Sequence, residues 1–416
     1  MWRDRTIART ARPSAFDYRA TRFPKDAARR QEERTVSVPR QEFESRMARA
    51  RAEMARAGMD GLVVTDPVGF YYFTGEKASP GRPAAFVLPA EGEPALVNWS
   101  GPDMFARLYR RPGNPCVADR RIYPEVPFDR EPATDWGLRD ILAERGLHAA
   151  RLGIELGNEP RLGLGLADLD RLRGELPGIR WVDASPVIWA CRMIKSEWEI
   201  EQLRQACAIG SRAWGQCLES LDEGVTQRAV QQRIMALYAE LGADLDSGPP
   251  VALGATGPGG AFRRGDILYL DGGCSVNGYK MDITRRAVFG APSARQQGEH
   301  DGMWEILFQV MEKIRPGVTT ASVFEYSQSL LARTGWTNYS DHSAKRIGHG
   351  IGLVNEPPYI NAFDTHVFQE GMSITPEPKI ETQEGLLNAE EHVIVRAQGC
   401  EIISGSLDWR LHTISL

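Results

Sequence analysis

The sequence predicts an α/β protein of two domains, a first domain of alternating helices and strands and a second of α+β type. The chain has 416 residues, which is too long for one ordinary hydrophobic core. Short apolar runs typical of strands alternate with helical patterns in its first half. In the second half, a helix-capping motif and a hairpin signal predict the α+β arrangement.

We expect three parts along the chain: a basic arm over residues 1–36, a first domain over 37–188 and a second over 189–416. The arm carries many arginines and little apolar periodicity. Two interpretations of it stay open. It is either a solvated tail or an arm that wraps a partner subunit, anchored by aromatic residues such as Trp2 and Phe16.

Composition excludes several classes of function. A net charge of -5 argues against nucleic acid or an anionic membrane as the main partner. No apolar run has the length of a membrane span, and the N-terminus lacks the apolar core of an export signal. The six cysteines show no paired spacing, so we expect reduced thiols, no cysteine-based zinc site and a cytoplasmic location.

The first domain is predicted from its periodicity. Apolar residues at three- and four-residue spacing predict a helix that ends at Gly58. Five strands and two further helices follow: strands at 61–65, 85–88, 94–97, 152–155 and 179–183, and helices near 135–146 and 166–176. No phosphate loop or GxGxxG motif is present, so nothing supports a nucleotide-binding role.

The second domain is expected to begin just after Pro186. Ser196 and Glu199 form a capping box that opens a long helix, and another helix follows near 229–241. Residues 249–260 are rich in Gly and Pro and are expected to form a loop. Beyond the hairpin described next, two amphipathic helices are predicted at 303–314 and 321–332.

The hairpin carries the first chemical signal. An apolar run leads into Asp271, and the pair Asn277-Gly278 predicts a two-residue turn. That register places Gly273 opposite Asp282, so Asp271 and Asp282 point to the same side as diagonal neighbours roughly 7–8 Å apart. Since Gly273 has no side chain, we expect an empty slot between the carboxylates. Two such close like charges need a proton or a cation.

Three later segments hold further candidate ligands. His349 stands among glycines, where backbone approaches a metal easily, and Glu377 stands between two prolines. Glu390 precedes an apolar strand. Taken singly, each has an ordinary structural interpretation.

Taken in this order, these motifs resemble the pita-bread metallopeptidase family, which includes aminopeptidase P, prolidase, methionine aminopeptidase and the metal-free creatinase. The resemblance extends over nearly the whole chain from about residue 37. Residues 63–67 and 72–75 resemble the creatinase-type N-terminal domain, and residues 192–196 with Glu199 resemble the entry to the catalytic domain. It implies a creatinase-like N-terminal α/β domain followed by a pita-bread catalytic domain.

The resemblance also implies a dinuclear metal centre. Its five ligands would be Asp271, Asp282, His349, Glu377 and Glu390. Asp282 and Glu390 would bridge two divalent ions, Asp271 would bind one, and His349 and Glu377 the other. This donor set suits Mn, Co, Fe or Zn. Glu377 would also be catalytic, as the carboxylate that moves a proton from the attacking water to the leaving group.

The chain departs from the peptidase pattern at three histidines that are not metal ligands. Residues 249–266 contain no histidine, Lys345 stands four residues before His349, and Asn355 precedes Glu356-Pro357-Pro358. The histidine loop is also one residue shorter than usual, as in the dimethylsulfoniopropionate lyase branch of the fold. Lys345 and Asn355 are therefore candidates for substrate binding.

Two enzymatic functions stay open, together with a scaffold protein that would not need the intact ligands. The first is a dinuclear metal-dependent hydrolase, similar to Xaa-Pro peptidases, that acts on a dipeptide or a small amide or amidine. The alternative is a metal-dependent lyase on a small zwitterion such as dimethylsulfoniopropionate. We expect a homodimer, because a neighbouring subunit would complete the walls of the pocket.

Overall fold

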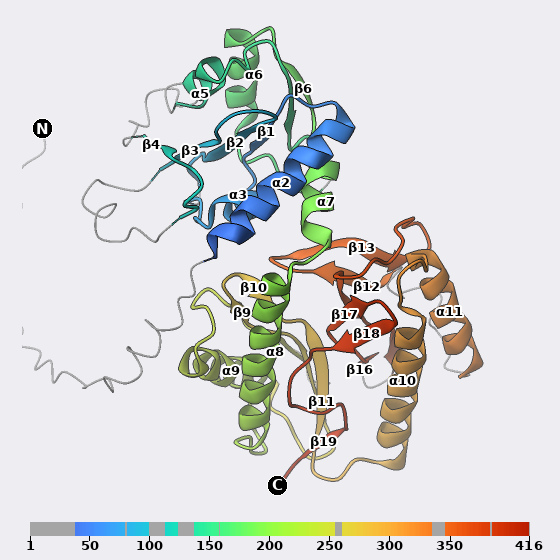
Figure 1. The fold of residues 1–416 in the computed structure, drawn as a ribbon. Helices are drawn as coiled ribbons and strands as arrows, with labels where there is room; N and C mark the ends of the chain where they lie inside the picture. Colours follow the sequence, from blue (N-terminus) through green and yellow to red (C-terminus); the bar gives the residue numbers. More distant parts are fainter. Residues whose placement is uncertain are drawn as a thin grey trace, which may run out of the picture. The chain divides into compact units, whose positions relative to one another are not determined.

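The computed structural model describes residues 38–79, 81–99, 113–123, 137–157, 159–253, 260–334, 346–382 and 385–415 (Figure 1). The predicted arm over residues 1–36 lies outside this range, so its role stays a prediction. All described elements belong to one unit of the chain, Ser37–Leu416. None of the described helices is long and apolar enough to cross a membrane.

The first part of this unit is a mixed six-stranded sheet in the order β4-β3-β2-β1-β5-β6. Its strands are β1 (Gly61–Val64), β2 (Ala85–Pro89), β3 (Ala95–Asn98), β4 (Asp119–Ile122), β5 (Arg151–Ile154) and β6 (Arg180–Asp183). Five of these strands agree with the sequence prediction. The sixth, β4, was missed because its charged sequence, Asp-Arg-Arg-Ile, has no apolar run.

Helices cover both faces of this sheet. They are α2 (Arg40–Ala57), α3 (Pro67–Thr74), α5 (Leu138–Glu144), α6 (Leu166–Glu175) and α7 (Ser185–Met193). Val63 packs with the buried residues of α5 and α6, whereas its neighbours Leu62 and Val64 pack with those of α2, α3 and α7. This alternation is the period-two pattern of a strand buried on both faces. Pro186, near which the boundary between the two domains was expected, lies in the first turn of α7.

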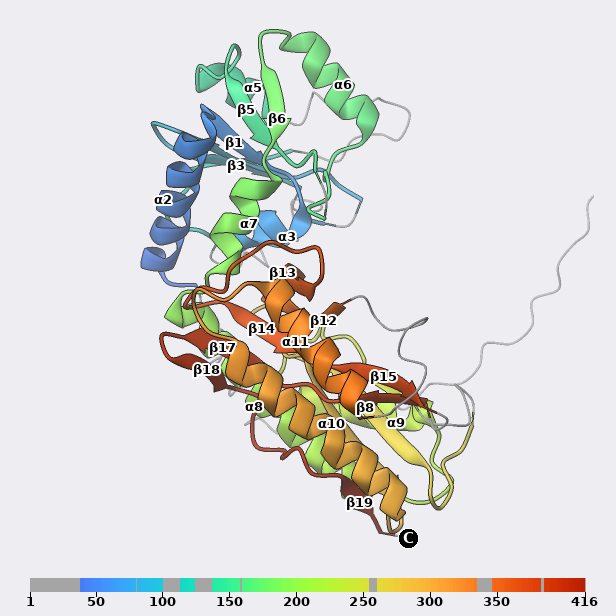
Figure 2. The same cartoon turned by 90° about the vertical axis from the view of Figure 1, so that its right-hand side faces the viewer.

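The second part contains two larger sheets, each packed against a pair of helices. One sheet has the order β19-β11-β8-β7 and contacts α8 (Glu197–Leu218) and α9 (Gln227–Leu241). The other has the order β13-β12-β14-β17-β18 and packs against α10 (Ala294–Lys313) and α11 (Thr320–Arg333), as Figure 2 shows. The strands of the first sheet are β7 (Val251–Leu253), β8 (Ile267–Gly272), β11 (Ile283–Phe289) and β19 (His412–Ile414). Those of the second are β12 (Arg346–Ile351), β13 (Asn355–Asn361), β14 (Ser373–Pro376), β17 (Val393–Arg396) and β18 (Gly399–Ile402).

Two details of this part differ from the sequence prediction. β7 lies inside the segment 249–260, so the prediction of a continuous loop there is wrong for residues 251–253. Helix α10 begins nine residues earlier than its predicted start at Met303, where Ser293 and Gln296 form a second capping box. The capping box of Ser196 and Glu199 at the start of α8 is confirmed.

The hairpin has the predicted register. Its short strands β9 (Ser275–Val276) and β10 (Tyr279–Lys280) pair Val276 with Tyr279 across a turn in which Asn277 and Gly278 both have positive φ, 50° and 82°. This is the backbone that a two-residue hairpin turn requires. Beyond the turn, Thr284 lies opposite Asp271, so the strands bring Asp271 and Asp282 to one region.

The space directly beside the Cα of Gly273 is occupied. A Cβ atom built on Gly273 would lie 2.6 Å from Cγ of Met281 and 2.8 Å from its carbonyl oxygen. Met281 therefore fills the space that the sequence left vacant. The glycine is needed because the two strands approach each other closely here.

A buried arginine ties the first helix to the hairpin. Arg46 of α2 donates from Nε to Glu42 at 2.8 Å and from one terminal nitrogen to the hydroxyl of Tyr279 at 2.9 Å. The Tyr279 hydroxyl in turn donates to Glu199 at 2.9 Å. Since all four side chains are buried, these bonds replace water for every charge in the group.

The contact of Gly273 with Met281 generates a prediction. We expect Gly273→Ala to lower the free energy of unfolding by about 1–3 kcal/mol, because an added methyl group must displace packed backbone and side-chain atoms. Chemical denaturation would measure the change. The matched control is Gly298→Ala in α10, where an added Cβ would meet nothing within 4 Å. It should leave stability unchanged or raise it by up to about 1 kcal/mol. Equal stability of the two variants would contradict the prediction.

Candidate metal centre

The candidate ligands lie at the ends of strands from both large sheets. Asp271 lies in β8 and Asp282 directly precedes β11, whereas His349 lies in β12. Glu377 directly follows β14, and Glu390 lies between β16 (Gly385–Asn388) and β17. Strand ends place these side chains where the two sheets meet, so segments more than 100 residues apart in sequence contribute to one site.

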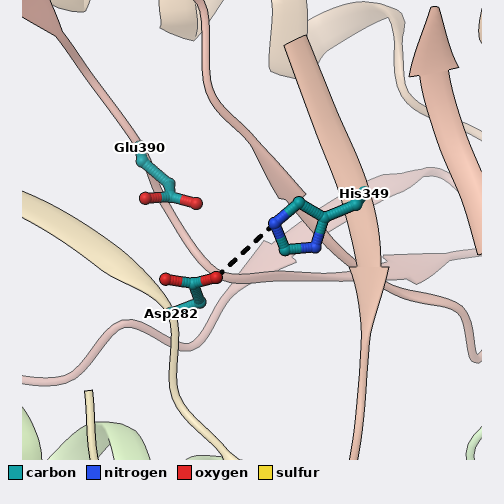
Figure 3. A group of neighbouring side chains, drawn as sticks. All are labelled: Asp282, His349 and Glu390. Atoms are coloured by element: carbon teal, nitrogen blue, oxygen red, sulfur yellow. Dashed lines mark ion pairs between the residues drawn. The ribbon is translucent and has the colours of Figure 1, made fainter. Parts of the chain in front are cut away.

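Three of these side chains converge closely. Asp282, His349 and Glu390 each offer a ligand atom, and these atoms all lie within 4.8 Å of one another. Figure 3 shows the two carboxylates and the imidazole facing a common point, with Nε2 of His349 3.5 Å from Oδ2 of Asp282. Asp282 is partly buried, and the other two residues are almost completely buried.

The imidazole is oriented by its second nitrogen. Nδ1 of His349 lies 3.0 Å from the carbonyl oxygen of Gly350, so we assign the proton to Nδ1, which donates to that oxygen. Nε2 then keeps its lone pair on the side of the carboxylates. Burial lowers the pKa of His349 to about 4, so the ring is neutral at pH 7. A neutral imidazole with a fixed tautomer is the form that binds metal.

Glu377 borders this group, and one of its oxygens accepts no hydrogen bond from the described residues. Its Oε1 lies 4.0 Å from Nε2 of His349 and accepts no hydrogen bond from the described residues, although it is buried. Its Oε2 accepts a hydrogen bond of 2.6 Å from the ammonium of Lys379. The guanidinium of Arg346 is 3.7 Å from Oε1. A buried carboxylate oxygen without a donor is costly unless a ligand completes its environment.

Asp271 and Glu390 are held by a shared set of hydrogen bonds. The hydroxyl of Tyr269 donates to Asp271 at 2.5 Å, and that of Thr284 donates to Glu390 at 3.0 Å. The amide of Asn388 donates to both hydroxyls, at 3.1 and 3.2 Å. One amide group therefore fixes the orientation of two donors that in turn fix two carboxylates.

The carboxylates are unfavourable in their ionised form. Burial raises the pKa of Asp271, Asp282 and Glu390 above their ordinary values. The neighbouring carboxylates raise the pKa values of Asp282 and Glu390 further, because like charges repel. These directions apply to the protein without bound metal.

Of the two candidate substrate-binding residues, only Asn355 lies among the described residues. The side-chain amide of Asn355, at the start of β13, lies 3.4 Å from Nε2 of His349, so this residue does adjoin the site. Lys345 lies outside the described residues. Its role therefore stays a prediction.

Five residues that support the candidate ligands were not predicted from the sequence. Tyr269, Thr284, Arg346 and Lys379 contact a ligand, and Asn388 donates to the hydroxyls of Tyr269 and Thr284. Four of them stand two residues from a candidate ligand. In a strand, residues two apart point to the same face, so this spacing was an available signal. Arg346 stands three residues before His349 and carries no comparable signal.

Comparison with known proteins identifies the family. The model of metallopeptidase family M24 matches residues 201–397, and that of the creatinase/prolidase N-terminal domain matches residues 46–194. An Xaa-Pro dipeptidase of Pyrococcus horikoshii is 31% identical over 258 residues, which cover 59% of this chain and 71% of the relative. A probable dipeptidase PepE of Mycobacterium tuberculosis is 32% identical over 361 residues, which cover 81% of this chain and 88% of the relative.

Solved structures agree with these matches. The structure of dipeptidase PepE from Mycobacterium ulcerans superposes with a TM-score of 0.72 at 25% sequence identity, and the match covers 91% of this chain and all of that one. The resemblance expected from the sequence motifs is thereby confirmed at the level of the family. The chain belongs to metallopeptidase family M24, with a creatinase/prolidase-type N-terminal α/β domain followed by a pita-bread catalytic domain.

Proposed function

We propose that the protein is a metal-dependent hydrolase that cleaves a carbon–nitrogen bond, either the peptide bond of an Xaa-Pro-like dipeptide or the corresponding bond of a small amide or amidine. The observation that carries this proposal is the convergence of Asp282, His349 and Glu390 beside the unpartnered oxygen of Glu377. The relatives bearing dipeptidase names support the same class of substrate. The homodimer, the cytoplasmic location and the domain boundaries at residues 36 and 188 stay predictions.

The residues fit a divalent metal ion. Carboxylate and imidazole donors suit Mn, Co, Fe or Zn, and five such ligands suffice for two ions. The fit rests on charge as well, since several buried carboxylates without a cation are unfavourable. We propose Asp271, Asp282, His349, Glu377 and Glu390 as the ligands.

Glu377 is proposed as the catalytic base. A divalent ion bound here supplies Lewis-acid activation of water and of the substrate carbonyl. Oε1 of Glu377 would accept the proton of the attacking water and pass it to the leaving nitrogen. Oε1 accepts no hydrogen bond from the described residues and has the guanidinium of Arg346 3.7 Å away, while Lys379 holds the other oxygen in place.

The surroundings of the site favour a small substrate with an anionic group. Arg346 borders Glu377 and is partly exposed, and its guanidinium lies over the ring of Tyr359. A guanidinium in that position can bind a carboxylate in two-point fashion. Asn355 and Lys345 stand where the resemblance places histidines in peptidases of the family, so we propose that this variant lacks their contacts to a longer peptide.

A substrate panel tests the proposed function. The metal-loaded protein is incubated with Xaa-Pro dipeptides, longer Xaa-Pro peptides, small amides and amidines, and dimethylsulfoniopropionate. Hydrolysis of a dipeptide, amide or amidine supports the proposal. Release of dimethyl sulfide and acrylate without hydrolysis of any amide would overturn it in favour of the lyase.

The proposed base gives a direct prediction. Glu377→Gln should lower kcat about 10²–10⁴-fold, because the amide keeps the shape of the side chain but accepts no proton. Steady-state kinetics on the best substrate of the panel would measure the loss, together with the metal content of the variant. Glu370→Gln is the matched control, because this glutamate is exposed in the loop before β14. A Glu377→Gln enzyme with normal metal content and unchanged kcat would contradict the role.

The repulsion among the carboxylates predicts how stability depends on pH. Since the pKa values of Asp271, Asp282 and Glu390 are raised on folding, the folded protein binds more protons than the unfolded chain in the range above their ordinary values of about 4. The free energy of unfolding of the metal-free protein should therefore fall as pH rises through this range. Asp282→Asn should make the fall shallower, because it removes one charge of the group.

Denaturation at a series of pH values, with and without metal, checks this sign. Metal at about 100 times its Kd should stabilise the wild-type protein by about 2.7 kcal/mol, and the Asp282→Asn variant by less. The explanation would be refuted if the metal-free wild-type protein gained stability as pH rises from 4 to 7 and the Asp282→Asn variant showed the same slope.

A further inference from the structure

Arg346, the first residue of β12, presents its guanidinium next to the candidate base. One terminal nitrogen lies 3.7 Å from Oε1 of Glu377, which is too long for a hydrogen bond, and the side chain is 39% exposed. The guanidinium donates no hydrogen bond to any described residue. Its N–H groups are therefore left for a ligand, and a carboxylate is the group that this planar fork binds in two-point fashion.

The ring of Tyr359 supports this guanidinium. Tyr359 lies in β13, directly across the ladder from His349. The guanidinium carbon of Arg346 is 5.5 Å from the centre of the Tyr359 ring, within the range of a cation–π contact. The backbone N–H of Tyr359 donates to Oδ2 of Asp364 at 2.8 Å. Strand pairing and this bond fix the backbone of Tyr359, so only the rotation of its side chain is left to be fixed.

The hydroxyl of Tyr359 is held from the first part of the chain. It donates to the carboxylate of Glu159, and both carboxylate oxygens are 2.6 Å away. Glu159 lies between β5 and α6, 200 residues earlier in the sequence. Burial and this contact raise the pKa of Tyr359, so its hydroxyl keeps the proton that it donates. Glu159 thus acts on Arg346 through the ring of Tyr359.

The segment that carries Glu159 has a defined shape. Glu159 has a φ of 74°, a left-handed backbone that a residue other than glycine keeps only where contacts hold it. The N–H of Arg161 lies 3.4 Å from Oδ1 of Asp66, and the N–H of Gly163 donates to the hydroxyl of Thr65 at 3.0 Å. Both acceptors are buried and directly follow β1. The segment is therefore tied to the first sheet, which determines where Glu159 lies.

We propose that Glu159 and Tyr359 are positioning residues that aim Arg346 at a carboxylate of the substrate, so that the enzyme prefers a substrate with a free carboxylate over its carboxamide. This rests on the proposed function, because it assumes hydrolysis at the same site. It narrows the substrate class to dipeptides and small amides or amidines whose carboxylate reaches Arg346 while the scissile bond lies at Glu377. It also gives the first part of the chain a share in the choice of substrate.

The test compares the best substrate of the panel with the same compound converted to its carboxamide. Steady-state kinetics of the metal-loaded full-length protein give kcat/KM for both compounds, and the ratio of the two values is the readout. A change at Glu377 or in metal content affects both compounds and cancels in this ratio. Arg346→Gln should lower the ratio at least about tenfold, because charge-assisted hydrogen bonds to the carboxylate are lost.

Two further variants remove only the support of Arg346. Tyr359→Phe and Glu159→Ala should each lower the ratio about 3–10-fold, through a higher KM for the carboxylate substrate with kcat retained. The double variant should be no worse than either single variant, because both act through one hydrogen bond. Glu159→Gln should restore most of the ratio, since its amide oxygen still accepts a hydrogen bond from the Tyr359 hydroxyl.

Tyr326→Phe is the matched control. Tyr326 of α11 also lies beneath a cation, with the ammonium of Lys313 4.7 Å from the centre of its ring. Neither residue contacts a candidate ligand, so this variant should leave the ratio unchanged. Thermal unfolding of every variant is measured alongside, because a contact that only joined the two parts of the chain would affect stability and not the ratio.

Each outcome decides the inference. An unchanged ratio in Tyr359→Phe and Glu159→Ala would overturn it and leave the proposed function standing, even if thermal stability falls. A best substrate without a carboxylate, or a wild-type enzyme that hydrolyses the carboxamide equally well, would do the same. A protein that hydrolyses nothing in the panel would overturn the proposed function and the inference with it.

Discussion

Mutual repulsion among buried carboxylates is the constraint on which this site depends. Asp271, Asp282, Glu377 and Glu390 come from different strands, and the fold brings them to one buried place where water screens their charges poorly. A chain selected only for stability would avoid this arrangement. Its presence means that the negative charge must be offset by protons, by basic side chains or by metal.

Hydrogen bonds and close packing around the site hold these carboxylates in place. Hydrogen bonds from Tyr269 and Thr284 fix one oxygen each of Asp271 and Glu390, and Asn388 fixes both donors. The close approach of Gly273 to Met281 keeps the hairpin strands together behind Asp282. Because these supports hold the carboxylates close together, their repulsion is relieved by protonation or by a cation that binds among them.

The sequence predicted the parts of this site that depend on local rules. The Asn277-Gly278 turn determined the register of the hairpin, and therefore the shared side of Asp271 and Asp282, because a two-residue turn allows one pairing. His349, Glu377 and Glu390 carried no comparable local signal, and the family resemblance drew attention to them. The other strands of the first sheet could be predicted from their apolar runs, whereas the charged strand β4 could not.

Features that depend on tertiary packing could not be predicted from the sequence. Gly273 seemed to leave an empty slot, but Met281 from the opposite strand fills it, and no periodicity could show this. Lys379 would be assigned to a solvated strand end from its sequence alone. Its contact with Glu377 depends on the pairing of β15 (Lys379–Thr382) with β16, which turns the lysine back toward the carboxylates. The same contact bears on the proposed chemistry. Lys379 donates to Oε2 of Glu377, whereas Oε1 accepts no hydrogen bond from the described residues and is the oxygen placed to accept a proton. The proposed proton transfers would then use one oxygen atom of Glu377, and the ammonium of Lys379, by holding the other oxygen, also selects that atom.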